Sequence, residues 1–131
     1  MGRDIHAPGY YVHIAPDECF LAAGIWHPDP ATLGAIRQAI VDEPERWQKA
    51  TSDKLFLKHW YLAGDRLQKP PRGFEKDHPQ VDDLKRKDFI AAHDLTEQDV
   101  LDKRFLNQVA TCFAAARPLM QFLCKATRVP F

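Results

Sequence analysis

Two stretches near the N-terminus decide the fold: GYYVHI at residues 9–14 and CFLAAGIW at residues 19–26. Both are rich in β-branched, aromatic and other apolar residues, as strands are. The sequence APDE at residues 15–18 lies between them and has the proline and acidic residues of a tight turn. Together the three stretches predict an antiparallel β-hairpin.

The second strand of this hairpin is apolar on both faces. A sheet with one face in water alternates apolar and polar residues, so we expect something to cover each face. Side-chain alternation gathers four aromatic and histidine side chains on one face: Tyr11, His13, Phe20 and Trp26. We expect that face to line a small pocket, to form an interface, or to be core beneath another part of the protein. An exposed aromatic face favours association, so we also expect a homodimer.

Helical patterns follow the hairpin. Asp29 can cap a helix at about residues 30–41, where Pro30 suits the first helical position. A longer helix is expected at about residues 103–127, because apolar residues recur there at steps of three and four. Pro118 lies inside it and predicts a kink or break near Arg117.

Shorter elements lie between these helices. They are predicted at residues 44–50 (helix), 55–62 (helix or strand), 79–86 (helix) and 88–93 (strand). We therefore predict a single α+β domain over residues 1–131: a small antiparallel sheet, made of the hairpin at about 9–26 and short strands, packed by helices at about 30–41 and 103–127.

Composition excludes several classes of protein. The chain has 131 residues, 45% of them hydrophobic, and its 18 Lys and Arg balance 18 Asp and Glu. Zero net charge argues against a broad nucleic-acid-binding surface. The sequence has no apolar run of about 20 residues and no secretory signal, so we expect no membrane partner. Three cysteines without CxxC spacing indicate buried thiols in a reducing compartment, and we expect a cytoplasmic protein.

Motifs for catalysis or cofactors are missing from the sequence. It has six histidines, at positions 6, 13, 27, 59, 78 and 93, but none forms an HExxH or similar ligand pair. We therefore expect no metal site and no cofactor. Gly-x-Ser-x-Gly and glycine-rich phosphate loops are also missing, so no catalytic residue is assigned.

A basic loop is the one candidate binding segment. Lys69, Arg72 and Lys76 cluster in a stretch that Pro70 and Pro71 stiffen. With Gly73 at a turn and Phe74 anchored inward, the cations could hold a phosphate or carboxylate beside the following helix. The alternative is that these cations are only solvated.

Several of these segments together resemble the family "domain of unknown function twenty-four sixty-one". The matching pieces are GYYVHI (9–14), GIWHP (24–28), LGAIRQAI (33–40), LAGDRL (62–67), PRGFEKDHP (71–79) and KDF (87–89). The resemblance spans about residues 3–127 and corresponds to the C-terminal portion of a family whose members are about twice as long. It implies a mixed fold with helices packed on a sheet, and it implies no activity and no catalytic residue.

Three functional hypotheses follow from the sequence. The first is a non-catalytic ligand-binding or interaction domain, because no catalytic constellation is visible. The second is an enzyme acting on an anionic small molecule or phosphodiester, with the basic loop and His13 or His78 as acid or base. The third is a nucleic-acid-binding accessory domain, against which the balanced charge argues.

Overall fold

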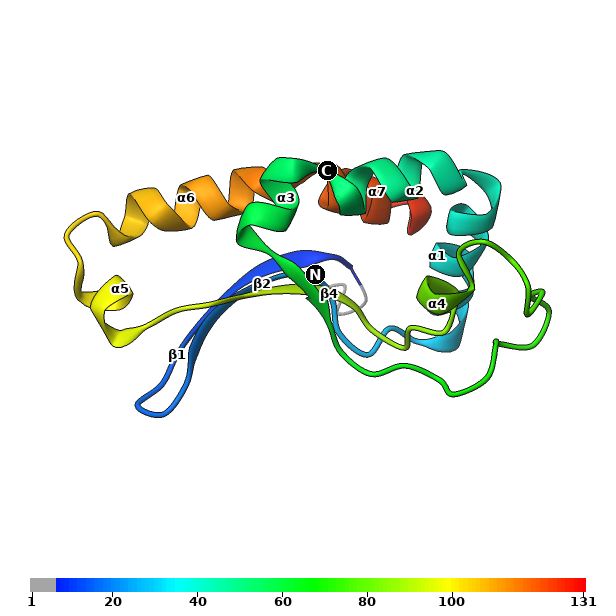
Figure 1. Ribbon diagram of the computed structural model, residues 1–131, viewed down its shortest axis with the longest axis horizontal. Coiled ribbons are helices and arrows are strands. Elements are labelled where there is room, and N and C mark those ends of the chain that lie inside the picture. The colour runs from blue at the N-terminus through cyan, green and yellow to red at the C-terminus, as the bar shows by residue number, and fades with distance from the viewer. Residues whose placement is uncertain (1–6) are drawn as a thin grey trace, which may run out of the picture.

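A computed structural model describes residues 7–131 of the chain, so His6 lies outside the described residues. The fold is α+β, as predicted (Figure 1). Its elements in chain order are β1 (Gly9–Ile14), β2 (Cys19–Ile25), α1 (Pro30–Asp42), α2 (Pro44–Ser52), α3 (Lys54–His59), β3 (Tyr61–Ala63), α4 (Val81–Leu84), β4 (Phe89–Asp94), α5 (Glu97–Leu101), α6 (Phe105–Ala115) and α7 (Arg117–Ala126).

The strands form an antiparallel sheet in the order β1-β2-β4-β3. The predicted hairpin is confirmed: Ala15 and Glu18 close its turn by exchanging backbone hydrogen bonds of 3.0 and 3.3 Å. β4 follows the other three strands in the sequence but lies between β2 and β3 in the sheet. The two edges of the described sheet are therefore β1 and β3.

Helices α2, α3, α6 and α7 lie on one side of the sheet, and α1 lies beside α4 at one end of the molecule (Figure 1). Leu21 and Ile25 of β2 and Phe89 of β4 point to that side and are fully buried in the core. Trp47 of α2 sets its ring edge against Phe89, with 5.7 Å between the ring centroids. Burial of such side chains is the main source of stability, at roughly 1.5–3 kcal/mol for each. The opposite side of the sheet is covered by no helix of the described chain.

Local signals explain several helix boundaries. The Asp29 side chain caps α1 by accepting a hydrogen bond from the Thr32 N–H at 2.8 Å. The predicted C-terminal helix is broken where Pro118 required it, and Ala116 separates α6 from α7. It also begins at Phe105 rather than residue 103, because the Asp102 carboxylate holds the Arg104 N–H in a turn at 2.7 Å.

The ambiguous stretch 55–62 contains the end of one element and the start of another. Asp53 caps α3 by accepting from two backbone N–H groups, and α3 ends at His59. Trp60 is extended, and β3 follows it.

Among the described residues, no helix has the length and apolar character needed to cross a membrane.

Candidate functional site

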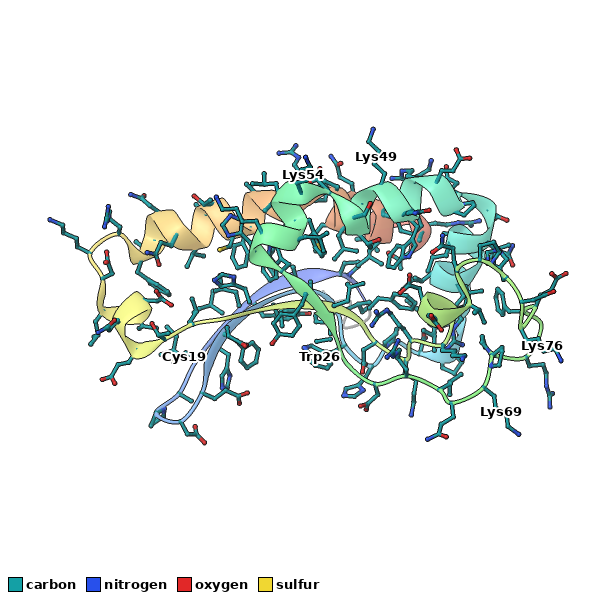
Figure 2. All side chains as sticks on the ribbon, viewed as in Figure 1. Cys19, Trp26, Lys49, Lys54, Lys69 and Lys76 are labelled. Atoms are coloured by element: carbon teal, nitrogen blue, oxygen red, sulfur yellow. The ribbon has the colours of Figure 1, made fainter. Side chains whose placement is uncertain are left out.

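The side of the sheet away from the helices carries the predicted aromatic face. Cross-strand pairs place Tyr11 opposite Ala22 and His13 opposite Phe20, so these residues share one side. The rings of His13 and Phe20 stack at 4.7 Å. Trp26 directly follows β2, and Figure 2 shows it below the sheet, away from the long helices. We call this surface, with Tyr61 of β3, the open face.

Side chains at the centre of the open face are buried, and those at its rim are exposed to solvent. Ala22 and Ile90 are each 1% exposed, whereas Tyr11, Trp26 and Tyr61 are 40–49% exposed. The Tyr61 hydroxyl donates to the Asp94 carboxylate at 2.9 Å, which raises the pKa of Tyr61. Half-exposed aromatic rings around a buried centre are typical of a surface that can bind a partner.

The basic loop has the predicted local form. Gly73 adopts a φ of +90°, and Phe74 packs against the core. Lys69, Arg72 and Lys76 are exposed, and Figure 2 shows Lys69 and Lys76 at the outer side of the loop. An anion site at these three residues stays a prediction.

The helix that follows this loop adds little to an anion site. It is α4, which has only four residues and carries Asp82 and Asp83 in its first turn. The nearby His78, which the sequence offered as an acid or base, has its Nδ1 engaged by the Gln80 N–H at 3.0 Å. The cations themselves would therefore have to provide the binding.

Three of the motif pieces quoted for the resemblance meet at one buried carboxylate, Asp88. Its Oδ1 accepts a hydrogen bond from the His27 N–H at 2.8 Å, and its Oδ2 accepts from the Asp65 N–H at 3.0 Å. Asp88 is 1% exposed, so these bonds replace lost hydration. It ties the segments after β2 and β3 to the start of β4. These motif residues therefore build the fold.

A second polar cluster lies at the other end of β4, and the sequence did not reveal it. His59 ends α3, His93 is on β4, and Cys112 is on α6. One potential ligand atom from each lies within 4.8 Å of the other two. The three residues are separated by 34 and 19 positions, so no spacing motif could have indicated them.

Neighbouring contacts hold this cluster in place. The Trp60 indole N–H donates to the Cys112 carbonyl at 2.7 Å in the interior, which fixes α6 against the end of α3. The His93 Nδ1 makes a short hydrogen bond with the His59 carbonyl. Because a carbonyl only accepts, Nδ1 carries a proton, and His93 Nε2 lies 3.8 Å from the Cys112 thiol.

Burial and nearby charges favour the neutral forms of His59 and Cys112. Burial lowers the pKa of His59, and the neighbouring His93 and Lys58 lower it further. Burial also raises the pKa of the Cys112 thiol, as does the charge of Asp99. A nucleophilic cysteine needs a cationic neighbour that lowers its pKa. The pair of imidazoles and a thiol therefore does not resemble an activated cysteine site.

The cluster lies in a pocket of about 630 Å³. Polar side chains between the end of β4 and the middle of α6 complete its lining: Asp94, Asp99, Arg104, Asn107, Gln108 and Thr111. This volume suits a small ligand.

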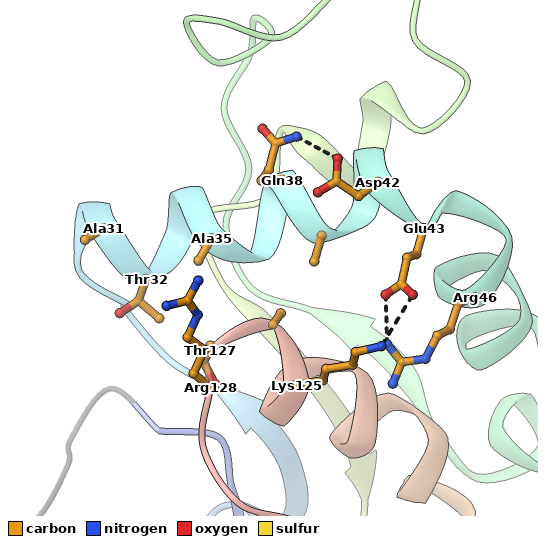
Figure 3. Close-up of a pocket in the computed structure, with 12 residues that line it drawn as sticks. Ala31, Thr32, Ala35, Gln38, Asp42, Glu43, Arg46, Lys125, Thr127 and Arg128 are labelled. Atoms are coloured by element: carbon orange, nitrogen blue, oxygen red, sulfur yellow. Dashed lines mark hydrogen bonds and ion pairs between the residues drawn. The ribbon is translucent and has the colours of Figure 1, made fainter.

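A pocket of similar size, about 660 Å³, lies between α1 and the end of α7 (Figure 3). There Glu43 pairs with Arg46 at 3.1 Å and with Lys125 at 3.5 Å, and Gln38 donates to Asp42 at 2.9 Å. These polar groups already bind one another on a solvated surface. The pocket is therefore the weaker candidate site.

Comparison with known proteins gives one result. A search of curated proteins and a search of solved structures find no match. The family model for conserved hypothetical protein DUF2461 matches residues 1–122 of the 131, which is most of the chain. This agrees with the resemblance carried by the hairpin, the glycine turns and the segment around Asp88. The chain belongs to the DUF2461 family of conserved hypothetical proteins.

Proposed function

We propose that the chain is a non-catalytic interaction domain that pairs with a second copy of itself along the outer edge of β1. The observation that carries this proposal is the exposed and apolar character of that edge. Within residues 7–131, no strand pairs with the outer side of β1. Tyr10, Tyr11, Val12 and Ile14 are 39–53% exposed. A free edge of this kind can add a strand from another chain.

The two edges of the sheet differ in the way this proposal requires. β3 has three residues and ends at the Gly64 turn, so it offers little backbone to pair with. β1 has six residues and contains no lysine, proline or acidic side chain that would discourage pairing. Protected edges are usually short or charged. β1 is neither.

A twofold axis perpendicular to the sheet would pair β1 with its copy and keep the helices of both copies on one side. Residues that face each other must then have the same parity, because alternate side chains point to opposite faces. One such register places Val12 opposite Val12 and Tyr11 opposite His13. The shifted register places Tyr11 opposite Tyr11. Either one joins the two open faces into one continuous aromatic surface.

Sedimentation over roughly 1–100 μM protein tests this proposal, since weak dimers form in that range. We expect a concentration-dependent dimer, and Val12→Lys should abolish it because two like charges would meet near the axis. Leu106→Lys is the matched control: Leu106 is 78% exposed on α6, far along the chain from β1, and this change should leave the dimer intact. A parent chain that stays monomeric throughout would contradict the proposal.

Disulfide trapping sharpens the test by identifying the register. In a Cys19→Ser background, Val12→Cys should cross-link to itself in the first register and Tyr11→Cys in the second. Leu106→Cys should form no specific dimer. Equal cross-linking at all three positions would indicate non-specific association.

A small-anion site on the basic loop is a second candidate, favoured by the inward anchor of Phe74 beside exposed cations. Inorganic phosphate should shift the amide signals of Lys69, Arg72 and Lys76. Arg72→Ala should remove those shifts while changing the free energy of unfolding by less than about 1 kcal/mol. Unshifted signals would mean that the cations are only solvated.

We place the domain in the cytoplasm, because three cysteines without a paired pattern favour a reducing compartment.

A further inference from the structure

We propose that His59, His93 and Cys112 bind a single transition-metal ion, best matched by Zn²⁺, in the pocket between α3, β4 and α6. This site is separate from the β1 edge and goes beyond the interaction function. It also revises the expectation from sequence that the chain has no metal site.

Distances within the cluster are close to those that zinc imposes. The Cys112 Sγ lies 3.8 Å from His59 Nδ1 and 3.8 Å from His93 Nε2. Tetrahedral zinc, with Zn–S of about 2.3 Å and Zn–N of about 2.0–2.1 Å, requires an S···N separation of about 3.6 Å. The corresponding N···N separation is about 3.4 Å, and the present ligand atoms lie within 4.8 Å of one another. Small rotations of the imidazole rings would complete the geometry.

The surroundings of His93 are those of a metal ligand. In such sites the histidine nitrogen that does not bind the ion donates to a carboxylate or a backbone carbonyl, which fixes the ring and its tautomer. His93 Nδ1 does this toward the His59 carbonyl. The carbonyl belongs to the residue whose own ring is the second nitrogen ligand. The backbone of one ligand therefore orients the ring of the other.

The alternative is an ordinary buried polar cluster, and its hydrogen bonds argue against that interpretation. Buried polar atoms normally have partners at normal length. Among the described residues, His59 Nε2 is buried without a hydrogen-bond partner, and the nearest partner of Nδ1 is the thiol at 3.8 Å. Within residues 7–131, neither ring nitrogen of His59 has a strong bond. A metal ion on Nδ1, the nitrogen beside the thiol, would give this ring the strong bond that it lacks there.

The donor set selects the class of metal. Two imidazole nitrogens and one sulfur suit zinc and its spectroscopic substitute cobalt, whereas magnesium and calcium prefer oxygen. Three protein ligands leave the fourth zinc position for water or a ligand from the pocket. Ion binding would release the thiol proton to solvent and form a bond between the metal and the thiolate.

A cobalt titration of the untagged, reduced and chelator-treated full chain tests the site. We expect one Co²⁺ per chain, with the visible bands of tetrahedral cobalt and a sulfur-to-cobalt charge-transfer band. Zn²⁺ should displace the cobalt and remove both signals. Cys112→Ala should abolish the charge-transfer band and weaken binding by more than about 100-fold.

Matched controls separate this site from other ligands in the chain. Cys124 is also a buried free thiol, and Cys124→Ala should leave the cobalt spectrum unchanged. His6→Gln should do the same, which excludes binding by the N-terminal residues. His59→Gln is the second test variant in case Cys112→Ala fails to fold, and circular dichroism of the metal-free variants checks this. The titration is repeated with Val12→Lys, because an ion that bridges two copies would be lost there.

Two results would overturn the proposal. One is a Kd weaker than about 100 μM for Co²⁺ and Zn²⁺ in the parent chain. The other is an unchanged cobalt spectrum in folded Cys112→Ala or His59→Gln. Neither result depends on whether the chain forms a dimer.

Discussion

β4 has a polar cluster at each end, and the two clusters differ in how fully hydrogen bonds within the protein satisfy them. At its start, both Asp88 oxygens accept backbone hydrogen bonds of 2.8 and 3.0 Å. Near its end, both contacts of the Cys112 thiol with imidazole nitrogens are 3.8 Å long. The first cluster is complete and binds the fold together. The second leaves His59 Nε2 without a partner among the described residues, and this difference separates a structural cluster from a candidate binding site.

The largest effect is expected from Asp88→Ala. The change removes the acceptor of two part-buried backbone N–H groups, those of His27 and Asp65. We expect a loss of about 3–5 kcal/mol in the free energy of unfolding, measured by urea denaturation. Asp88→Asn, which keeps one acceptor oxygen, should cost less. Equal stability of Asp88→Ala and the parent would remove the distinction between the two clusters.

Zinc should produce the next largest effect, in the opposite direction. At a free concentration 100-fold above its Kd, zinc should stabilise the parent chain by about 2.7 kcal/mol, because it binds the folded state. The measurement is urea denaturation with and without Zn²⁺. Asp88→Asn should keep this increment and Cys112→Ala should lose it. An increment lost in Asp88→Asn would mean that the two clusters are coupled.

Gly64→Ala tests the close packing around Asp88. Gly64 has a φ of +92°, and an added Cβ would lie 2.6 Å from the Asp88 Cβ. We expect a loss of about 2 kcal/mol, from backbone strain together with displacement of the carboxylate. Gly73→Ala is the control, since it has a φ of +90° but open space around its Cβ position. It should cost less, and the difference between the two losses measures the contact with Asp88.

The smallest effect is expected from Cys112→Ala without metal. The thiol is a weak donor and its two contacts with imidazole nitrogens are 3.8 Å long, so the loss should be about 1 kcal/mol, mainly from packing. Cys124→Ala provides the comparison, because that thiol is also buried. A loss above about 3 kcal/mol for Cys112→Ala alone would indicate that the metal-free cluster is already a structural one.

The features that the sequence could predict depend on nearby residues. The hairpin turn, the Asp29 cap and the break at Pro118 each follow from chemistry within a few positions. The boundary between α3 and β3 was open, because the apolar run 55–62 continues across it, and tertiary contacts of Trp60 decide it. Tyr11, His13 and Phe20 could be assigned to one side by alternation alone, whereas Tyr61 joins them only through the pairing of β3 with β4.

The cluster of His59, His93 and Cys112 could not be predicted in this way. Its members belong to α3, β4 and α6, and each is unremarkable within its own segment. His59 follows a lysine at the end of a short helix, and Cys112 lies in an apolar helical stripe. Only the packing of α6 over the end of α3 brings them together. Such a site is a property of the tertiary structure.

The central position of β4 has a consequence for how the chain folds. β2 and β3 both precede β4, and each needs it as a neighbour, so the sheet cannot form until residue 94 is available. The hydrogen bond between His27 and Asp88 spans 61 residues, which makes this pairing strongly non-local. Closing such a long loop slows folding, because its entropy is lost before most contacts form. During synthesis the β1–β2 hairpin is complete before β4 is made, so the edge of β2 that later pairs with β4 stays unpaired. At this stage the exposed strand edge is most open to aggregation, and a chaperone that bound it would prevent this.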